Sequence, residues 1–255
     1  MIYAYIQDGR HRQINSTTPP DADWWIRRDD VDHSYVDSDG CVYTSVTRWL
    51  EEMEGKPFDA AVEAARLSQS LTGEYTGKSP EQIVAAWEDA AVVAQGLHAA
   101  IESYINNSFY ATSIQGLPYV KQVEQFKAWR ADNLGEHVRS EMLLWSRSAL
   151  LAGTADLVSW RDDVGARIDD IKTWKIEDQY RVREASRQIS LYALMLGDML
   201  DCDVTIGGVL LWENYYNLRV GAELRFIPIR DRRGEMMSLL RTRENQRDKQ
   251  REGQA

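Results

Sequence analysis

Two aspartates in short apolar segments are the residues of this chain best suited to chemistry. Asp156 lies in the apolar segment 150–160, and Asp170 lies in a second segment of strand character, 167–174. Side chains alternate between the two faces of a strand, so Asp170 and Lys172 share one face. Paired carboxylates suit a hard divalent cation such as Mg²⁺, and a neighbouring lysine can orient or activate an attacking water. The spacing therefore predicts metal-dependent hydrolysis.

Each aspartate alone would be interpreted as an ordinary carboxylate near a turn or in an ion pair. Two acids inside apolar strands are costly to bury unless a cation or another partner compensates them. Because Lys172 also stands at the offset expected for a hydrolytic site, two residues after Asp170, we interpret Asp156 and Asp170 as metal ligands. Gln188 and Tyr192 lie four residues apart on a predicted helix, so they share one helix face and can both look toward this pair.

In this order the motifs resemble the RecB-like branch of the PD-(D/E)XK nuclease superfamily. That pattern is Gly-x-x-Asp, then Asp/Glu-x-Lys, then Gln-x-x-x-Tyr on a following helix, and here it reads Gly153 to Asp156, Asp170 to Lys172 and Gln188 to Tyr192. Asp-x-Lys alone is common, whereas the ordered set is far more specific.

The resemblance spans about residues 40–215. Its lead-in, formed by 43–47, 78–81 and Trp87 before Gly96, is similar to that of phage, large-virus and mitochondrial exonucleases of this type. The resemblance implies an α/β (α+β) fold with a restriction-endonuclease-like core, in which a mixed, mostly antiparallel sheet is flanked by helices and preceded by an N-terminal helical region.

The resemblance also assigns roles to individual residues. Gln188 would contact the lysine, a water at the metal or DNA, and Tyr192 would support the site or the DNA backbone. The implied catalytic residues are Asp156, Asp170, Lys172, Gln188 and Tyr192. The implied metal ligands are His98, Asp156, Asp170 and the main-chain carbonyl of Ile171, with Glu141 as a further candidate for a second metal or for positioning water.

Several of these roles have a plain structural alternative. His98 alone would be interpreted as a partly buried helical histidine, but Gly96 could let another backbone approach and Glu102 lies one turn later on the same face. Glu141 could equally be an exposed glutamate at the start of a strand. Core packing is a serious rival role for Tyr192. Trp174 is the tryptophan that we expect to stack on an unpaired base of DNA.

The bulk properties favour one globular domain. The chain has 255 residues, 44% of them hydrophobic and 27% charged, and no apolar run near the ~20 residues needed to span a bilayer. We expect a single nuclease domain over 1–240, with a mostly helical part (1–135), a catalytic core (136–230) and a polar, arginine-rich tail (241–255). Residues 1–9 lack the pattern of a targeting segment, which predicts residence in the cytoplasm, or the host cytoplasm for a viral protein, without a membrane partner.

Composition also excludes some cofactors. Only Cys41 and Cys202 are present, which excludes a disulfide framework, a four-cysteine zinc site and the iron-sulfur cluster that several RecB-like nucleases hold. The segment 73–79 has only three residues between its glycines where a phosphate-binding loop needs four, which argues against ATP. A net charge of −10 argues against a protein that coats nucleic acid, although a nuclease needs cations only along its groove.

Local signals place the elements along the chain. Ser45 and Ser79 have the character of helix N-caps, and Pro80 suits the first helical position. The helices expected are 45–54, stopping at Gly55, then 58–71, 79–105, 119–134 and 178–200. The strands expected are 1–7, 34–37, 137–146, 150–161, 166–173, 204–212 and 218–229, with a turn at 162–165, and the last dozen residues are expected to be disordered or a solvated helix.

Together these patterns predict a Mg²⁺- or Mn²⁺-dependent DNA nuclease, an exonuclease acting on DNA ends with a preference for single strands. The helical segment 44–107 would roof the groove and admit a free end. Replication or recombination proteins are the expected partners besides DNA. Two alternatives stay open, namely a nuclease fold that binds DNA or assembles without catalysis, and an endonuclease with the same metal site.

Overall fold

The computed structural model describes residues 2–7, 12–16, 18, 20–29, 34–53, 58–106, 119–135, 137–161, 165–174, 179–212 and 222–252. The predicted helix stop at Gly55, most of the turn at 162–165 and the first residues of the last predicted strand lie outside these ranges. The elements in chain order are β1 (Ile2–Gln7), β2 (Arg12–Ser16), β3 (Ile26–Arg28), β4 (Tyr35–Asp37), β5 (Val42–Ser45), α1 (Val46–Met53), α2 (Ala60–Ser68), α3 (Pro80–Ile105), α4 (Val120–Asn133), β6 (His137–Ser146), β7 (Leu151–Arg161), β8 (Gly165–Lys172), α5 (Gln179–Leu200), β9 (Val204–Trp212), β10 (Leu224–Pro228) and α6 (Arg233–Glu252).

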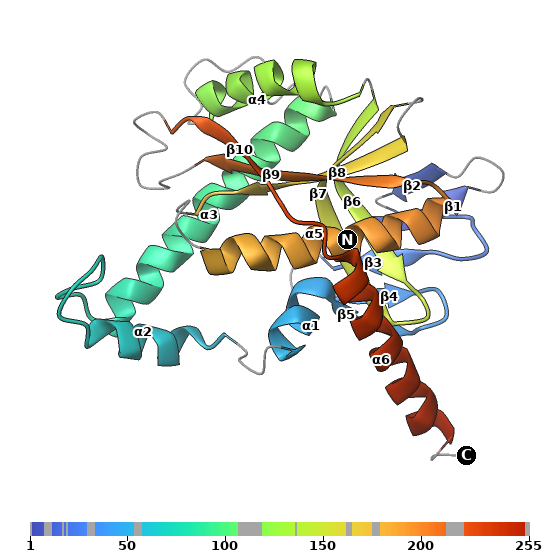
Figure 1. Ribbon diagram of the computed structural model, residues 1–255, viewed down its shortest axis with the longest axis horizontal. Coiled ribbons are helices and arrows are strands. Elements are labelled where there is room, and N and C mark those ends of the chain that lie inside the picture. The colour runs from blue at the N-terminus through green and yellow to red at the C-terminus, as the bar shows by residue number, and fades with distance from the viewer. Residues whose placement is uncertain are drawn as a thin grey trace.

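The described strands form one mixed sheet, in the order β10-β9-β8-β7-β5-β4-β3-β1-β2, with β6 paired to β7. Only β5 with β7 and β8 with β9 pair in parallel, and the other pairs are antiparallel. Helices lie on both sides of this sheet (Figure 1). The predicted α/β class, a mostly antiparallel mixed sheet flanked by helices, is confirmed.

The pairing of β7 creates an opening in the sheet. β6 pairs with β7 along nearly its whole length, so β5 and β8 share the other edge of β7. β5 pairs there with Leu151 and Ala152, whereas β8 pairs from Leu157 onward. The end of β8, including Asp170 and Lys172, pairs only with β9. The strands therefore part beside Asp156, where a site can form between them.

Hydrophobic layers on the two sheet faces hold the helices that border this opening. On one face α5 buries Ile189 and Leu196 against a cluster that includes Ile168 of β8. On the other face Leu97 of α3 packs with Ile171 of β8. Alternation along β8 separates these two layers. Each such fully buried side chain stabilises the fold by about 1.5–3 kcal/mol, which fixes α3 and α5 on opposite sides of the sheet.

The two predicted N-caps, Ser45 and Ser79, are confirmed, whereas the helix expected from residue 58 begins at Ala60 with Asp59 as its N-cap. The Arg48 N–H donates to Ser45 Oγ at 3.2 Å, before α1. At the start of α3 the Gln82 N–H donates to Ser79 Oγ while the Ser79 N–H donates to Gln82 Oε1 at 2.9 Å, a capping box with Pro80 at the first position. These caps fix where α3 begins and hence how far along it His98 lies.

The two ends of the chain differ from the sequence expectation. Before Val46 the structure forms β1 to β5, of which only β1 and β4 were predicted, because three- to five-residue strands carry little periodicity. The predicted boundary at residue 240 falls inside α6, which continues to Glu252 and so takes in most of the last dozen residues, for which disorder or a helix was expected. Arg243 of α6 donates to the carbonyl oxygen of Ala149 and to Thr44 Oγ1, both at 2.9 Å, which fastens α6 to the sheet.

None of the described helices combines the length and apolar character needed to cross a membrane.

Candidate metal centre

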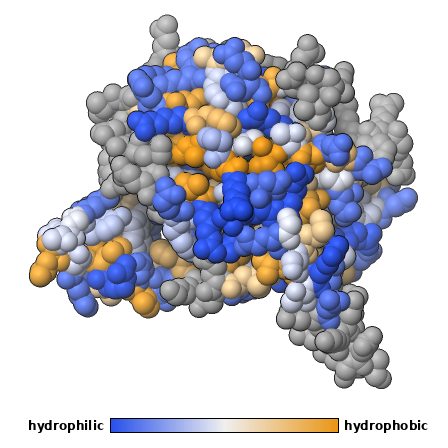
Figure 2. Space-filling model, in the orientation of Figure 1, coloured by the Kyte–Doolittle hydropathy of each residue, from blue (hydrophilic) through white to orange (hydrophobic). Residues whose placement is uncertain are grey.

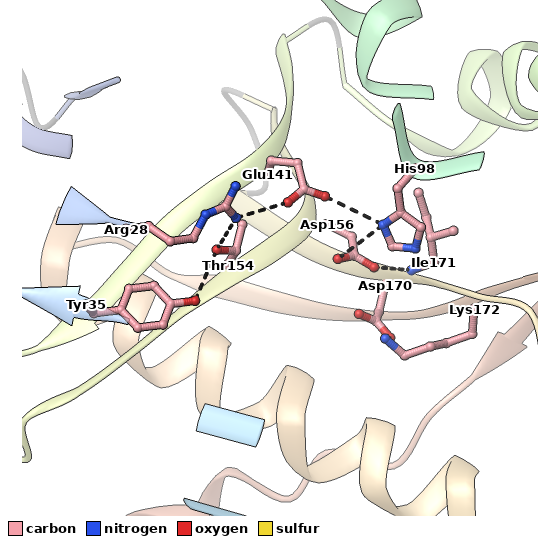
Figure 3. Close-up of polar contacts among 9 residues, drawn as sticks. All are labelled: Arg28, Tyr35, His98, Glu141, Thr154, Asp156, Asp170, Ile171 and Lys172. Atoms are coloured by element: carbon pink, nitrogen blue, oxygen red, sulfur yellow. Dashed lines mark hydrogen bonds and ion pairs between the residues drawn. The ribbon is translucent and has the colours of Figure 1, made fainter. Parts of the chain in front are cut away.

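His98, Glu141 and Asp156 converge at the opening beside β7 (Figure 3). His98 Nδ1 lies 3.6 Å from Glu141 Oε1 and 3.8 Å from Asp156 Oδ1. One ligand atom from each of the three residues lies within 4.8 Å of the others. A ring nitrogen and two carboxylate oxygens form a donor set suited to a divalent cation. The three elements α3, β6 and β7 therefore supply a candidate metal centre.

Glu141 reaches this centre through an unusual backbone conformation. Its φ of +51° lies in the left-handed region, which a non-glycine residue rarely adopts. The flanking pairs Ser140–Leu157 and Met142–Ala155 keep β6 in register, so the distortion is confined to Glu141. Such a conformation costs about 1–3 kcal/mol and is common at functional sites. Glu141, predicted only as a further candidate, thus takes a full place in the group.

Asp156 also connects the centre to β8. Its Oδ1 faces His98, while its Oδ2 accepts a hydrogen bond of 2.8 Å from the Ile171 N–H. The resemblance implied the carbonyl of Ile171 as a metal ligand, and this stays a prediction, since the contact described here is made by the Ile171 N–H. Asp156 therefore holds the end of β8 beside the cluster.

Asp170 and Lys172 form an ion pair next to this cluster. Lys172 Nζ lies 2.7 Å from Asp170 Oδ2, as their shared strand face predicted. Asp170 is only 2% exposed, and apart from this ion pair its Oδ2 has no partner among the described residues. A buried carboxylate oxygen in this position retains capacity for a cation.

The carboxylates keep the basic groups of the site protonated. Burial alone would lower the pKa of His98, but Asp156 and Glu141 together raise it to about 9. Burial would likewise lower the pKa of Lys172, yet Asp170 and Asp156 raise it. The site thus favours positive charge, which a divalent cation would also supply.

The pKa values of Asp170 and Glu141 are shifted in opposite directions. Burial, opposed by Lys172 and aided by Asp156, raises the pKa of Asp170 to about 7. For Glu141 burial would raise the pKa, but hydrogen bonding to His98 and the charge of Arg28 hold it below its ordinary value. A carboxyl group of raised pKa beside an ionised one is an arrangement that is common at functional sites.

Arg28 and Tyr35 of the N-terminal strands reach the same centre. Arg28 Nη1 donates to Thr154 Oγ1 at 2.9 Å and lies 3.5 Å from Glu141 Oε2, and the Tyr35 hydroxyl lies 3.5 Å from Thr154 Oγ1. Sequence reasoning missed both residues because they precede the segment of the family resemblance. No local signal connects β3 and β4 to a site more than a hundred residues away.

Gln188 and Tyr192 lie on the face of α5 that looks toward the site. Gln188 Nε2 donates to the Tyr192 hydroxyl at 3.3 Å, while the predicted contact of Gln188 with the lysine is not among the described hydrogen bonds. Tyr192 is 3% exposed and belongs to the core cluster of α5, yet it also lines the cavity of the metal centre. Tyr192 therefore packs in the core, as its alternative role predicted, and also borders the cavity, while its support of a catalytic site stays a prediction.

Gly96 leaves room for the side chain of Tyr119, whereas we expected it to leave room for another segment of backbone. A Cβ atom on Gly96 would lie under 3 Å from the ring and hydroxyl of Tyr119 at the start of α4. This contact joins α3 to α4 two residues before His98.

Two adjoining cavities open at the centre. The first, about 480 Å³, is lined by the cluster of His98, Glu141 and Asp156, and the second, about 720 Å³, by Lys172 and Trp174. The indole Nε1 of Trp174 is buried without a described hydrogen-bond partner, and the ring packs partly against the core. Its predicted stacking on a base stays a prediction.

The chain matches no protein-family model, and a search of curated proteins finds no significant match. The likeness to the PD-(D/E)XK nucleases consequently stays an expectation from the order of the sequence motifs alone.

Proposed function

We propose that this chain is a Mg²⁺- or Mn²⁺-dependent DNA nuclease of the PD-(D/E)XK type, an exonuclease that acts on DNA ends and prefers single strands. The observation that carries the proposal is the convergence of His98, Glu141 and Asp156 within 4.8 Å. The ion pair of Asp170 and Lys172 beside them supplies the second half of a hydrolytic site.

The residues fit a divalent cation on three counts. The donor set combines one imidazole nitrogen with carboxylate oxygens, which suits Mn²⁺ and, through the oxygens, Mg²⁺. The buried Asp170 Oδ2 has only the Lys172 ammonium, at 2.7 Å, as its partner among the described residues, so a cation can share this carboxylate. The cluster also raises the pKa of His98 to about 9, mainly through Asp156 and Glu141 against the effect of burial, so it stabilises added positive charge.

In this proposal His98, Glu141 and Asp156 hold the cation and Asp170 completes its surroundings. A bound divalent cation would polarise a phosphoryl oxygen and make a water more nucleophilic. Lys172, kept protonated by Asp170, orients that water and offsets the charge that builds up on phosphorus-bound oxygens. Tyr192 and Gln188, both on α5, line the site and position the DNA backbone.

The surrounding helices support action on ends. Thr47 of α1, Ala94 and Gln95 of α3 and Gln188 of α5 line the cavity that contains the metal cluster, so phosphate would reach the cluster between helices. A single flexible strand enters such a groove more easily than a stiff duplex.

The test is a gel assay of end-labelled linear DNA, single- and double-stranded, with Mg²⁺, Mn²⁺ or excess EDTA. Cleavage that needs Mg²⁺ or Mn²⁺ supports the proposal. Cleavage undiminished in EDTA contradicts the metal-dependent mechanism, whereas binding without cleavage under every condition favours a nuclease fold without catalysis.

A further inference from the structure

Solvent-exposed aromatic rings line the larger cavity beside the candidate metal centre. This cavity, of about 720 Å³, is bounded by α1, α2, the end of β8 and the start of α5. Phe58 is 63% exposed and Tyr180 is 55% exposed, and both line it. In the view of Figure 2 apolar and hydrophilic side chains are mixed over α2 at the lower left, whereas the surface near the centre is mainly hydrophilic. Exposed rings in a hollow are surfaces for a flat ligand.

This cavity adjoins the cavity of the candidate metal centre. Thr47 and Gln188 line both cavities, and Lys172 lines the larger one with its ammonium 2.7 Å from Asp170. A substrate with a phosphate at the cluster would therefore place the adjoining part of the molecule in the larger cavity.

The charges of the larger cavity argue against a phosphate-dense occupant. Carboxylates outnumber cations among its lining residues, and Lys172 is already paired with Asp170. A row of phosphates gains affinity from lysine and arginine and is repelled by acids. The charged lining residues are Glu51, Asp59, Glu63, Glu184, Lys172 and Arg181.

We infer that this cavity holds an unstacked base of single-stranded DNA, next to the scissile phosphate, on the rings of Phe58 and Tyr180. The inference rests on the proposed nuclease function and names the feature that selects single strands. A duplex keeps its base faces covered and would bring a second row of phosphates past the carboxylates. Because every base has a π face, stacking of this kind tolerates any sequence.

The test compares ring-deleting and ring-retaining variants. Phe58→Ala and Tyr180→Ala remove each ring, whereas Phe58→Tyr and Tyr180→Phe keep it. Leu71→Ala, at a residue 91% exposed that does not line the cavity, is the matched control. Because the Phe58 ring also packs against Trp87, with ring centroids 5.6 Å apart, melting temperatures are measured for all five variants and KM is determined where each is folded. KM is measured on a single-stranded oligonucleotide and on the same oligonucleotide carrying consecutive abasic positions.

Each alanine variant is expected to raise KM for the intact oligonucleotide about tenfold, in line with stacking on one base, while the ring-retaining variants and Leu71→Ala leave it unchanged. Abasic positions should raise KM for the unmodified protein but not for the double variant Phe58→Ala/Tyr180→Ala, because the two losses remove the same contact. Unchanged KM in the alanine variants, or the same abasic penalty in the double variant, overturns the stacking site while cleavage still supports the nuclease.

Binding without cleavage separates the two proposals. Fluorescence anisotropy with the labelled oligonucleotide in Ca²⁺ measures affinity independently of turnover. If no metal supports cleavage but affinity still depends on both the rings and the bases, the stacking site stands and the nuclease proposal fails.

Discussion

Tyr192 of α5 lies directly against Gly153 of β7, where a Cβ atom on the glycine would come within 2.6 Å of Tyr192 Cε1. The Gly-x-x-Asp motif and the Gln-x-x-x-Tyr motif, almost forty residues apart in the sequence, are thus in direct contact. The glycine lets the tyrosine ring pass beside the strand three residues before Asp156. The contact fixes the separation between α5 and the strand that carries the metal ligand.

Gly153→Ala is therefore expected to destabilise the fold by about 1–3 kcal/mol, the usual cost of overpacking. Thermal unfolding of Gly153→Ala, Tyr192→Leu and the double variant measures the coupling between the two sites, which should be favourable because the smaller Leu makes room for the methyl group. Gly234→Ala, where an added Cβ meets nothing within 4 Å, is the control. Additive losses in the double variant would show that the two residues do not constrain each other.

Asp156→Asn and Asp170→Asn should each reduce cleavage by two or more orders of magnitude without unfolding the protein. The substitution removes ligand charge but leaves no cavity, and in Asp156→Asn the amide oxygen can still accept the hydrogen bond from the Ile171 N–H. Steady-state rates in Mg²⁺ and in Mn²⁺ measure the effect. Asp132→Asn, an exposed position on α4, should retain full activity. Cleavage near the original rate in either site variant would exclude the proposed metal chemistry.

His98→Ala should weaken Mn²⁺ binding by more than about tenfold. Groups that only orient a ligand change metal affinity by about 10- to 100-fold, so loss of a ligand should cost at least as much. Isothermal titration calorimetry gives the affinity, and added Mn²⁺ should recover part of the activity. His137→Ala, at an exposed residue of β6, serves as the comparison. Identical titration curves for His98→Ala and the unmodified protein would return His98 to an ordinary helical histidine.

Metal affinity should rise with pH between about 7 and 9. Burial would lower the pKa of His98, but Asp156 and Glu141 raise it to about 9, so the proton on its ring competes with the cation below that pH. Loss of one proton on binding gives about a tenfold gain in apparent affinity per pH unit, which levels off above 9. Mn²⁺ titrations across this range measure the slope, and His98→Ala should lose it. A flat profile in the unmodified protein would contradict ligation by His98.

Linear single-stranded DNA should be degraded at least about tenfold faster than a covalently closed circle of the same sequence. A circle has no free end, so it must insert a loop of DNA between α1, α3 and α5, and forming that loop costs entropy. This cost raises the activation free energy of cleavage and lowers the rate on the circle. Loss of acid-insoluble label at equal Mg²⁺ gives both rates, and the salt dependence should be similar on the two forms because the phosphate contacts are the same. Comparable rates would instead assign the chain to the endonucleases.

The local elements could be predicted because their causes lie within a few residues. Ser79, Pro80 and Gln82 form the cap of α3 from four consecutive positions, and the strand ending at Ser146 follows the predicted bounds. The shared face of Asp170 and Lys172 follows from strand alternation alone, and the structure confirms their ion pair. The order of motifs along the chain also predicted the α/β class.

Tertiary pairing decided the composition of the candidate metal centre. Glu141 enters it through a left-handed backbone that no periodicity indicates, and Arg28 reaches Thr154 from a three-residue strand. The same holds for Phe58 and Tyr180, whose exposure depends on how α2 and α5 border the cavity. The sequence by itself determined which residues could do chemistry, because residue type and local spacing are written in it. Which of them meet depends on contacts between distant segments, and only the folded sheet brings those segments together.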